Sequence, residues 1–160
     1  MVRRERVETP RLVLVPIPRD VAAEILDGNL SGVRAGEGWP LEDSLVPMRT
    51  AARYDVEPGW FVTLSDLVIG DCHTHGWVPD DQGSIEIGYN LAEAYRGRGY
   101  GTELVTGLSR WLLGQAGVER IVARRVPVEN VPSRRALERA GFVLEKADDQ
   151  YSWYALTTTD

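Results

Sequence analysis

A chain of 160 residues in which 43% of the side chains are apolar and 26% are charged is long enough to fold around a hydrophobic core of its own. Its net charge of −6 disfavours a nucleic acid or an anionic membrane surface as the main partner, because both would repel it. The charge is unevenly spread. Nine arginines and four glutamates lie between residues 96 and 139, and this locally basic segment suits a small polyanionic ligand.

The chain also lacks the marks of a secreted or membrane-bound protein. Its single cysteine, Cys72, excludes an internal disulfide and is compatible with a reducing compartment. No run of about 18 apolar residues is present, so we expect no membrane span. Residues 2–8 lack the apolar core of a signal peptide. We therefore expect a cytoplasmic protein.

Apolar and alternating stretches predict seven strands and four helices. The strands are expected at residues 12–17, 60–64, 67–75, 84–91, 120–126, 142–145 and 151–156. The helices are expected at residues 19–27, 42–54 and 130–140 and between Thr102 and Gly117, where Leu104, Leu108, Trp111 and Leu112 recur on one face. The order of these elements predicts one mixed α/β domain over residues 1–160.

The most informative segment, residues 96–102, joins the strand at 84–91 to the long helix and reads Arg-Gly-Arg-Gly-Tyr-Gly-Thr. The first N–H groups of a helix lack partners within the helix, and the helix dipole attracts negative charge. Glycine lets the backbone approach a ligand closely, and Arg96 and Arg98 can supply charge-assisted hydrogen bonds. The segment therefore predicts a phosphate-binding loop.

Two nucleotide-binding loops fit this segment poorly. A P-loop requires Gly-x-x-x-x-Gly-Lys-Ser/Thr, and no lysine lies here. A dinucleotide fingerprint requires Gly-x-Gly-x-x-Gly, whereas Gly97, Gly99 and Gly101 simply alternate. Its acidic ribose partner would lie at the end of the next strand, but Glu119 precedes that strand. An ordinary tight turn is the remaining alternative.

The spacing Arg96-x-x-Gly99-x-Gly101 resembles the acyl-coenzyme A-binding motif of the GNAT superfamily of N-acetyltransferases. Further agreement comes from the Glu-Ile-Gly-Tyr string at 86–89, from Asn130-x-x-Ser133, from the Gly-Phe pair at 141–142 and from residues 8–12. These features are most similar to the branch of ribosomal-protein N-terminal (alanine/serine) acetyltransferases. The resemblance is strong over residues 84–145, fair over 8–28 and weak over 29–60.

The resemblance implies an α+β fold with a mostly antiparallel sheet of about six to seven strands flanked by about four helices, with a splay between strands 4 and 5. It also implies acetyl-coenzyme A as the acyl donor, with its pantetheine arm beside the fourth strand like an added strand. Gly99 and Gly101 would allow close approach and positive φ where required. An N–H near Tyr89 or Asn90 would stabilise the thioester oxyanion. The implied coenzyme A-binding residues are Tyr89, Leu91, Ala92, Arg96, Gly97, Arg98, Gly99, Tyr100, Gly101, Thr102, Asn130, Ser133 and Arg134.

Acetyl transfer to an amine requires a base that removes a proton from an ammonium group, directly or through water. Glu86 is the leading candidate, and its parity on the strand is opposite to that of Ile85 and Ile87. A role in supporting the strand or positioning the substrate is the alternative.

A second candidate group shares one parity on the neighbouring strand and comprises Asp71, His73 and His75. Histidine titrates near neutrality and can relay protons. His-x-His alone is too little for a metal, so no metal site is expected.

The acid that protonates the leaving thiolate is not in its usual place. Many family members use a tyrosine four residues before the Gly of Gly-Phe, and that position here is Leu137. Ser133 is the substitute that the ribosomal-protein branch implies, and N-capping of the helix at 130–140 is its alternative role. Tyr151 and Tyr154 on the last strand are further candidates.

We therefore expect an acetyl-coenzyme A-dependent N-acetyltransferase that transfers acetyl directly to a primary amine in a ternary complex, without a metal. The acceptor stays open between a small molecule and a protein N-terminus, and the acidic remainder of the chain favours a cationic one. No nucleic acid or membrane partner is expected, and a homodimer is left open. The alternative is a non-catalytic acyl-coenzyme A sensor or assembly module on the same fold.

Overall fold

The computed structural model describes residues 4–158. Within that range the chain divides by its internal contacts into two compact units. The first is built from residues 4–73 and 89–96, and the second from residues 74–88 and 97–158. The expectation of a single domain over residues 1–160 stays a prediction.

The first unit contains an antiparallel sheet in the order β1-β2-β3-β4. Its elements are β1 (Val7–Glu8), β2 (Val13–Pro16), α1 (Arg19–Leu26), α2 (Glu42–Tyr54), β3 (Trp60–Leu64), β4 (Leu67–Thr74, of which Thr74 belongs to the second unit) and the short 3₁₀ helix η1 (Glu93–Tyr95). Strands β3 and β4, which the sequence predicts at residues 60–64 and 67–75, form a hairpin. Its turn residues Ser65 and Asp66 have φ of 48° and 69°, the left-handed conformation that matches the twist of a tight hairpin.

Apolar side chains from the helices and strands of the first unit pack into one core. The buried members are Ile17, Ala22, Ile25, Trp39, Met48, Phe61, Val68 and Ala92. Trp39 lies in the loop before α2 and meets Phe61 of β3 edge-to-face, with ring centroids 5.7 Å apart. Residues 29–40 are thus anchored in the core although they have almost no regular structure.

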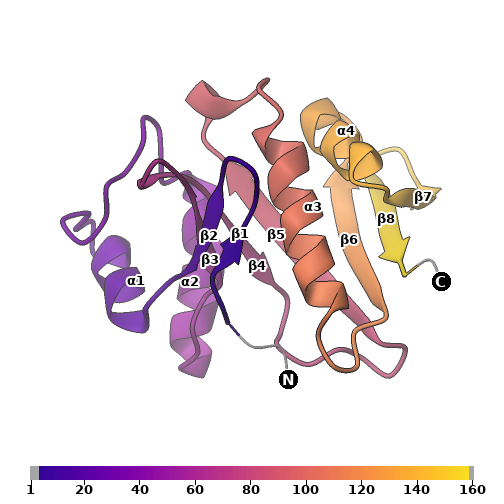
Figure 1. Cartoon of the computed structure of the whole chain (residues 1–160), viewed down its shortest axis with the longest axis horizontal. Helices are drawn as coiled ribbons and strands as arrows, with labels where there is room; N and C mark the ends of the chain where they lie inside the picture. Colours follow the sequence, from indigo (N-terminus) through magenta and orange to yellow (C-terminus); the bar gives the residue numbers. More distant parts are fainter. Residues whose placement is uncertain (1–3, 159–160) are drawn as a thin grey trace. The chain divides into compact units, whose positions relative to one another are not determined.

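The second unit carries β5 (Ser84–Leu91, of which residues 84–88 belong here), α3 (Tyr100–Leu113), β6 (Arg120–Pro127), α4 (Val131–Arg139), β7 (Val143–Ala147) and β8 (Tyr151–Thr157). The strand order is β5-β6-β8-β7, with β5 parallel to β6 and the other pairs antiparallel. Helices α3 and α4 lie side by side over one face of these strands (Figure 1). The face of α3 that the sequence predicts as apolar is buried at Leu104, Leu108 and Leu112.

Strands β5 and β6 pair only from Ser84 to Glu86 and from Arg120 to Val122. Each strand has eight residues, so most of each one continues without this pairing. These are the two strands between which the family resemblance implies a splay, and the short pairing agrees with it.

Strand β6 also contains a bulge, where the register against β8 shifts between Ala123 and Val126. Arg124 and Arg125 occupy the shift, and Arg125 has φ of 54°, which is unusual for a residue other than glycine. A bulge of this kind bends the strand and changes where its side chains point.

The structure corrects the sequence prediction at three elements. Helix α3 ends at Leu113 with Gly114 as its C-cap, so Gly117 lies in the turn beyond and does not close the helix. Strand β1 and the 3₁₀ helix η1 were not predicted, because two and three residues are too short to show a periodicity. The bounds of α2, β3 and β5 agree with the prediction. Among the described residues, no helix is long and apolar enough to span a bilayer.

Candidate active site

The glycine-rich segment forms the turn that leads into α3. Gly97 and Gly99 have φ of 77° and 84°, and Gly99 is the N-cap residue. No side chain caps this helix, so its first N–H groups have no side-chain acceptor from the cap position. Arg98 is exposed beside them, while Tyr100 and Thr102 at the start of the helix are half-buried. The turn therefore presents backbone donors at a positive helix end, as an oxyanion or phosphate requires.

Gly101 differs from the other two glycines. It lies within α3 with an ordinary helical φ, so the positive φ values fall at residues 97 and 99 and not at 101. A Cβ atom at residue 101 would lie 3.7 Å from the Cβ of Ala136 on α4, which is normal contact. The fold itself therefore does not require glycine at this position.

Arg96 belongs to the first unit and is partly committed there. Its Nε donates to the carbonyl oxygen of Leu91 at 2.9 Å, although the side chain is exposed. Arg96 therefore closes the short segment that contains η1.

Backbone hydrogen bonds show which way the residues of β5 face. The N–H of Ala92 donates to the carbonyl of Ile69 on β4 at 2.8 Å, and the carbonyl of Glu86 accepts from the N–H of His75 at 2.8 Å. Backbone groups alternate in direction along a strand. Tyr89 and Leu91 therefore direct their N–H and C=O groups away from β4, on the side where an added strand could pair, and the C=O of Leu91 already accepts from Arg96 there.

The same alternation changes the expectation for two residues. Ala92 donates its N–H to the carbonyl of Ile69 within the fold, so this donor does not point toward the side where a pantetheine arm would add, and the listing of Ala92 as a coenzyme A-binding residue stays a prediction. Asn90 has the parity of Ala92, which leaves Tyr89 as the better placed of the two oxyanion donors considered.

The start of α4 is capped by Asn130. Its Oδ1 accepts from the N–H of Ser133 at 3.3 Å, and a proline follows within the first turn. The capping role that was the alternative for Ser133 therefore belongs to Asn130. Ser133 is half-buried on the first turn of α4.

Arg134 joins the loop after β6 to strand β8. Its Nε donates to the Tyr154 hydroxyl and its Nη1 to the carbonyl of Val128, both at 3.1 Å. The Tyr154 hydroxyl donates in turn to Glu138 Oε1 at 2.9 Å. Tyr154 is 1% exposed, so its hydroxyl is committed to this network. Arg134 thus braces the segment that carries Asn130.

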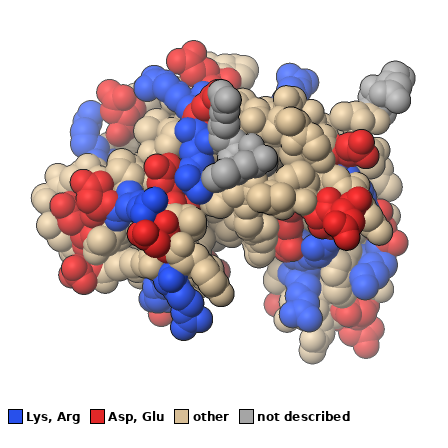
Figure 2. Space-filling view, turned by 90° about the horizontal axis from the view of Figure 1, so that it is seen from below, with Lys and Arg blue, Asp and Glu red and all other residues tan. Residues whose placement is uncertain are grey.

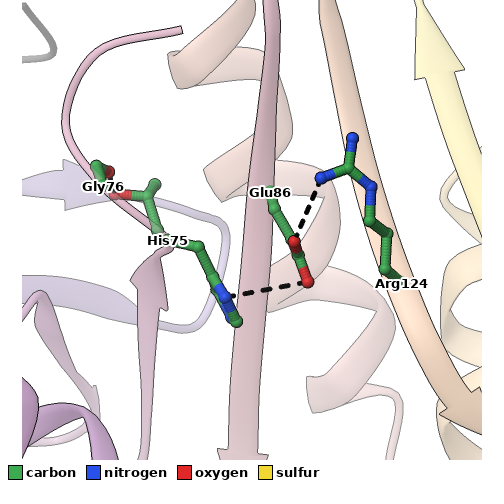
Figure 3. Close-up of polar contacts among 5 residues, drawn as sticks. His75, Gly76, Glu86 and Arg124 are labelled. Carbon is green, nitrogen blue, oxygen red and sulfur yellow. Dashed lines mark hydrogen bonds and ion pairs between the residues drawn. The ribbon is translucent and has the colours of Figure 1, made fainter. Parts of the chain in front are cut away.

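Glu86 faces away from the apolar core, as its parity predicts, and its side chain is 18% exposed. Its Oε1 lies 3.3 Å from Arg124 Nη1 on β6, and its Oε2 lies 3.7 Å from Nδ1 of His75 (Figure 3). The carboxylate is thus bracketed by a guanidinium and an imidazole, each about half exposed.

The three residues of the second candidate base group do not all belong to one unit. Asp71 and His73 belong to the first unit and His75 to the second. Asp71 is 2% exposed and is held by Trp39 and Asn90. Burial raises the pKa of the Asp71 carboxyl, and hydrogen bonds from Ser44, Asn90 and Trp39 oppose that rise.

Sequence reasoning missed two features of the site. Arg124 was counted only as one basic residue among many, and the structure places it in the bulge of β6, where it meets Glu86. The contact of Asp71 with Trp39 joins residues 32 positions apart, for which the sequence carries no signal. Among residues 4–158, no group of three or more His, Cys, Asp or Glu side chains is placed to hold a metal ion.

Charged side chains of both signs are intermingled on the face shown in Figure 2. No single basic stripe runs across the described residues of that face, as a nucleic acid backbone would require.

Three comparisons place this chain among known proteins. Residues 11–143 match the family described as an acetyltransferase (GNAT) domain. The chain is 35% identical over 80 residues to the uncharacterised N-acetyltransferase YjdG of Bacillus subtilis (strain 168), a match that covers 50% of this chain and 47% of YjdG. The aligned region thus spans about half the length of that relative.

Solved acetyltransferases share the fold. Mycobacterium smegmatis RimJ in complex with CoA-disulfide is 22% identical with a TM-score of 0.64, covering 96% of this chain and 86% of that one. AAC(6')-Ib in complex with paromomycin and acetyl-CoA is 21% identical with a TM-score of 0.66, covering 92% of this chain and 93% of that one. At these sequence identities, the structural similarity shows a shared fold and nothing more.

Proposed function

Because this chain belongs to the GNAT acetyltransferase family, we propose that it transfers the acetyl group of acetyl-coenzyme A directly to a primary amine in a ternary complex. The amine nitrogen attacks the thioester carbonyl, the C–S bond breaks, and coenzyme A leaves as a thiolate that takes up a proton. The protein must therefore hold the thioester, stabilise the oxyanion, remove a proton from the ammonium and supply one to the sulfur.

The observation that carries this proposal is the N-terminus of α3, which no side chain caps and which follows two glycines of positive φ. A pyrophosphate requires several converging N–H donors, and this turn presents them without a capping side chain in the way. Arg98 adds a guanidinium at the same end of the helix. The segment from Gly97 to Thr102 would hold the pyrophosphate.

Strand β5 would hold the pantetheine arm. Tyr89 and Leu91 direct their backbone groups away from β4, and the pairing of β5 with β6 ends at Glu86. An extended ligand could therefore add to this edge as a strand does. The N–H of Tyr89 is our choice of oxyanion donor.

Glu86 would act as the base. Its side chain is mostly shielded from solvent, and its carboxylate reaches His75, whose side chain is 52% exposed. A proton taken from the ammonium by Glu86 can pass to solvent through His75, because one ring nitrogen of an imidazole can accept a proton while the other donates one. Arg124 holds the other carboxylate oxygen and fixes the side-chain orientation.

Ser133 would donate the proton to the leaving thiolate. The cap of α4 is supplied by Asn130, so the Ser133 hydroxyl is not needed for that purpose. Leu137, at the position where many family members have a tyrosine, is fully buried and has no proton to give.

The acceptor is an amine that carries positive charge at neutral pH. AAC(6')-Ib, which shares the fold, was solved with an aminoglycoside, a polycationic amine. The net charge of −6 would favour approach of such an acceptor to this chain.

Calorimetry with coenzyme A tests the loop assignment. Wild-type protein should bind, and Gly99→Trp should weaken binding by about a hundredfold or more because the indole fills the place of the pyrophosphate. Gly28→Trp is a matched control, since Gly28 has the same φ of 84° and open space around it at the end of α1. Equal affinity in both variants would refute the assignment.

A further inference from the structure

The proposed chemistry leaves one buried charged group unused, the carboxylate of Asp71 on β4. Asp71 Oδ2 accepts from Nε1 of Trp39, and Oδ1 accepts from Nδ2 of Asn90, each at 2.9 Å. All three residues lie within the first unit. Because only 2% of Asp71 is exposed, water cannot replace either donor.

A third donor reaches the same carboxylate from α2. The Ser44 hydroxyl hydrogen-bonds to Asp71, and Ser44 also accepts from the N–H of Leu41 at 3.2 Å in the first turn of that helix. Ser44 is fully buried. One carboxylate thus joins the start of α2, the loop before it and the end of β5.

The Trp39 side of this network holds a loop that has almost no regular structure. The indole packs edge-to-face on Phe61, and the N–H of Glu37 donates to the Tyr95 hydroxyl at 3.3 Å. The N–H of Gly36 donates to the carbonyl of Val68 at 2.8 Å. Residues 36–41, which we name the Trp39 segment, are therefore fixed from several sides.

The Asn90 side of the network lies between the two residues that would hold the pantetheine arm. The approach of β4 to β5 is very close here, since a Cβ atom at Gly70 would lie 2.4 Å from the carbonyl oxygen of Asn90. The side-chain bond to Asp71 adds to this contact and fixes the rotation of β5 about its own axis. That rotation decides where the N–H groups of Tyr89 and Leu91 point.

We propose that Asp71 is a positioning residue, which locks the Trp39 segment and the pantetheine-binding end of β5 into one arrangement. The inference rests on the proposed function, because it assigns a role to β5 in that reaction. If either Trp39 or Asn90 moved away, part of the buried Asp71 carboxylate would lose its hydrogen bond. That energetic cost holds both segments in place. The negative charge of Asp43 also opposes ionisation of Asp71. The hydrogen-bond donors around Asp71 are therefore needed to stabilise its carboxylate form.

A swap of the two side chains tests the inference. Asn90→Asp places two carboxylates against each other, and we expect it to weaken coenzyme A binding by about tenfold. Adding Asp71→Asn places an amide opposite the new carboxylate at position 90, so that one side chain again donates a hydrogen bond to the other. The oxygen of the new amide at position 71 still accepts from Trp39. The double variant should recover coenzyme A affinity to within about threefold of wild type.

A second variant removes only one donor. Trp39→Phe keeps a ring against Phe61 and deletes the indole N–H, and it should weaken coenzyme A binding by about threefold although residue 39 is not among the proposed coenzyme A contacts. The Nε1–H resonance of Trp39 in a ¹⁵N spectrum should shift in Asn90→Asp and return in the double variant. Asp66→Asn, at the exposed turn before β4, is the control and should change neither reading.

The outcomes separate the two levels of the claim. If wild-type protein does not bind coenzyme A, the proposed function is wrong and the inference falls with it. If wild-type protein binds but the double variant is no better than Asn90→Asp, only the role of Asp71 is refuted. Unchanged coenzyme A affinity in both Trp39→Phe and Asn90→Asp would refute it as well.

Discussion

The carboxylate of Glu86 on β5 faces the guanidinium of Arg124 on β6, with Oε1 3.3 Å from Nη1. The contact joins residues 38 positions apart in sequence. Arg124 enters it from the bulge of β6, at the level where the pairing of the two strands ends. The bulge therefore orients the guanidinium of Arg124 toward the carboxylate of Glu86.

Glu86→Gln should lower kcat by about a hundredfold or more, because a carboxamide cannot take a proton from the ammonium. The affinity for coenzyme A should change by less than about threefold, since the backbone of β5 carries that contact. Steady-state kinetics and calorimetry measure the two effects. Full activity of this variant across the pH range would remove Glu86 from the mechanism.

Arg124→Gln should lower kcat by about three- to tenfold, because the carboxylate of Glu86 loses the contact that orients it. Arg125→Gln is the matched control, since Arg125 occupies the same bulge and has no ion pair with Glu86 among the contacts described between residues 4 and 158. Equal losses in the two variants would show that the bulge matters and the Glu86 contact does not.

Gly101→Ala separates ligand binding from stability. The added Cβ would meet Ala136 at 3.7 Å, and alanine is favoured over glycine inside a helix by about 1 kcal/mol, so thermal stability should hold or rise. Coenzyme A affinity should fall by about tenfold if the backbone at residue 101 lies against the pyrophosphate. Thermal unfolding and calorimetry on the same sample decide the matter, and an unchanged affinity would move the pyrophosphate away from Gly101.

Asn130→Ala and Ser133→Ala should have different effects. Loss of the Asn130 cap should lower the free energy of unfolding by about 1 kcal/mol. Ser133→Ala should leave stability within about 0.5 kcal/mol and lower kcat, if its hydroxyl protonates the leaving thiolate. Urea unfolding and turnover of both variants test this. A Ser133→Ala variant with normal turnover would leave the acid unassigned.

Asp71 should make stability depend on pH. Its pKa in the folded protein is raised above the ordinary value of 3.8, mainly by burial. Between these two values the folded state holds a proton that the unfolded state has lost, so the free energy of unfolding falls as pH rises through that window. Relative to Asp71→Asn, the wild type should therefore lose stability from about pH 4 upward. Urea unfolding of both proteins over the pH range tests this direction. A free energy of unfolding that rises with pH in the wild type relative to Asp71→Asn would contradict it.

The sequence predicts most of the fold where periodicity is strong. The bounds of α2 and β5 agree with it because their apolar residues recur at the spacing of a helix and of a strand. The end of α3 was misplaced, because both Gly114 and Gly117 can follow a helix and the last turn is decided by tertiary packing. Strand β1 exists only through its pairing with β2, where Val7 faces Leu14, and two residues carry no periodicity of their own.

In the candidate site, too, the sequence predicts the local features and misses the contacts between distant residues. The turn from Gly97 to Gly99 is a local motif, and the sequence shows it because positive φ and helix N-termini leave local signatures. The contacts of Glu86 with Arg124 and of Asp71 with Trp39 depend on how distant segments pair. A single sequence carries no signal for such contacts, and the structure is needed to assign partners to both carboxylates.

The most direct test of the central claim is release of free thiol from acetyl-coenzyme A, measured with a chromogenic disulfide against a panel of amines of increasing positive charge. Mass spectrometry of the same reactions identifies the acylated product. We expect thiol release that depends on the amine, with one acetylated amine formed for each thiol released. Tight binding of coenzyme A with no amine-dependent thiol release across the panel would contradict the account and favour a non-catalytic sensor.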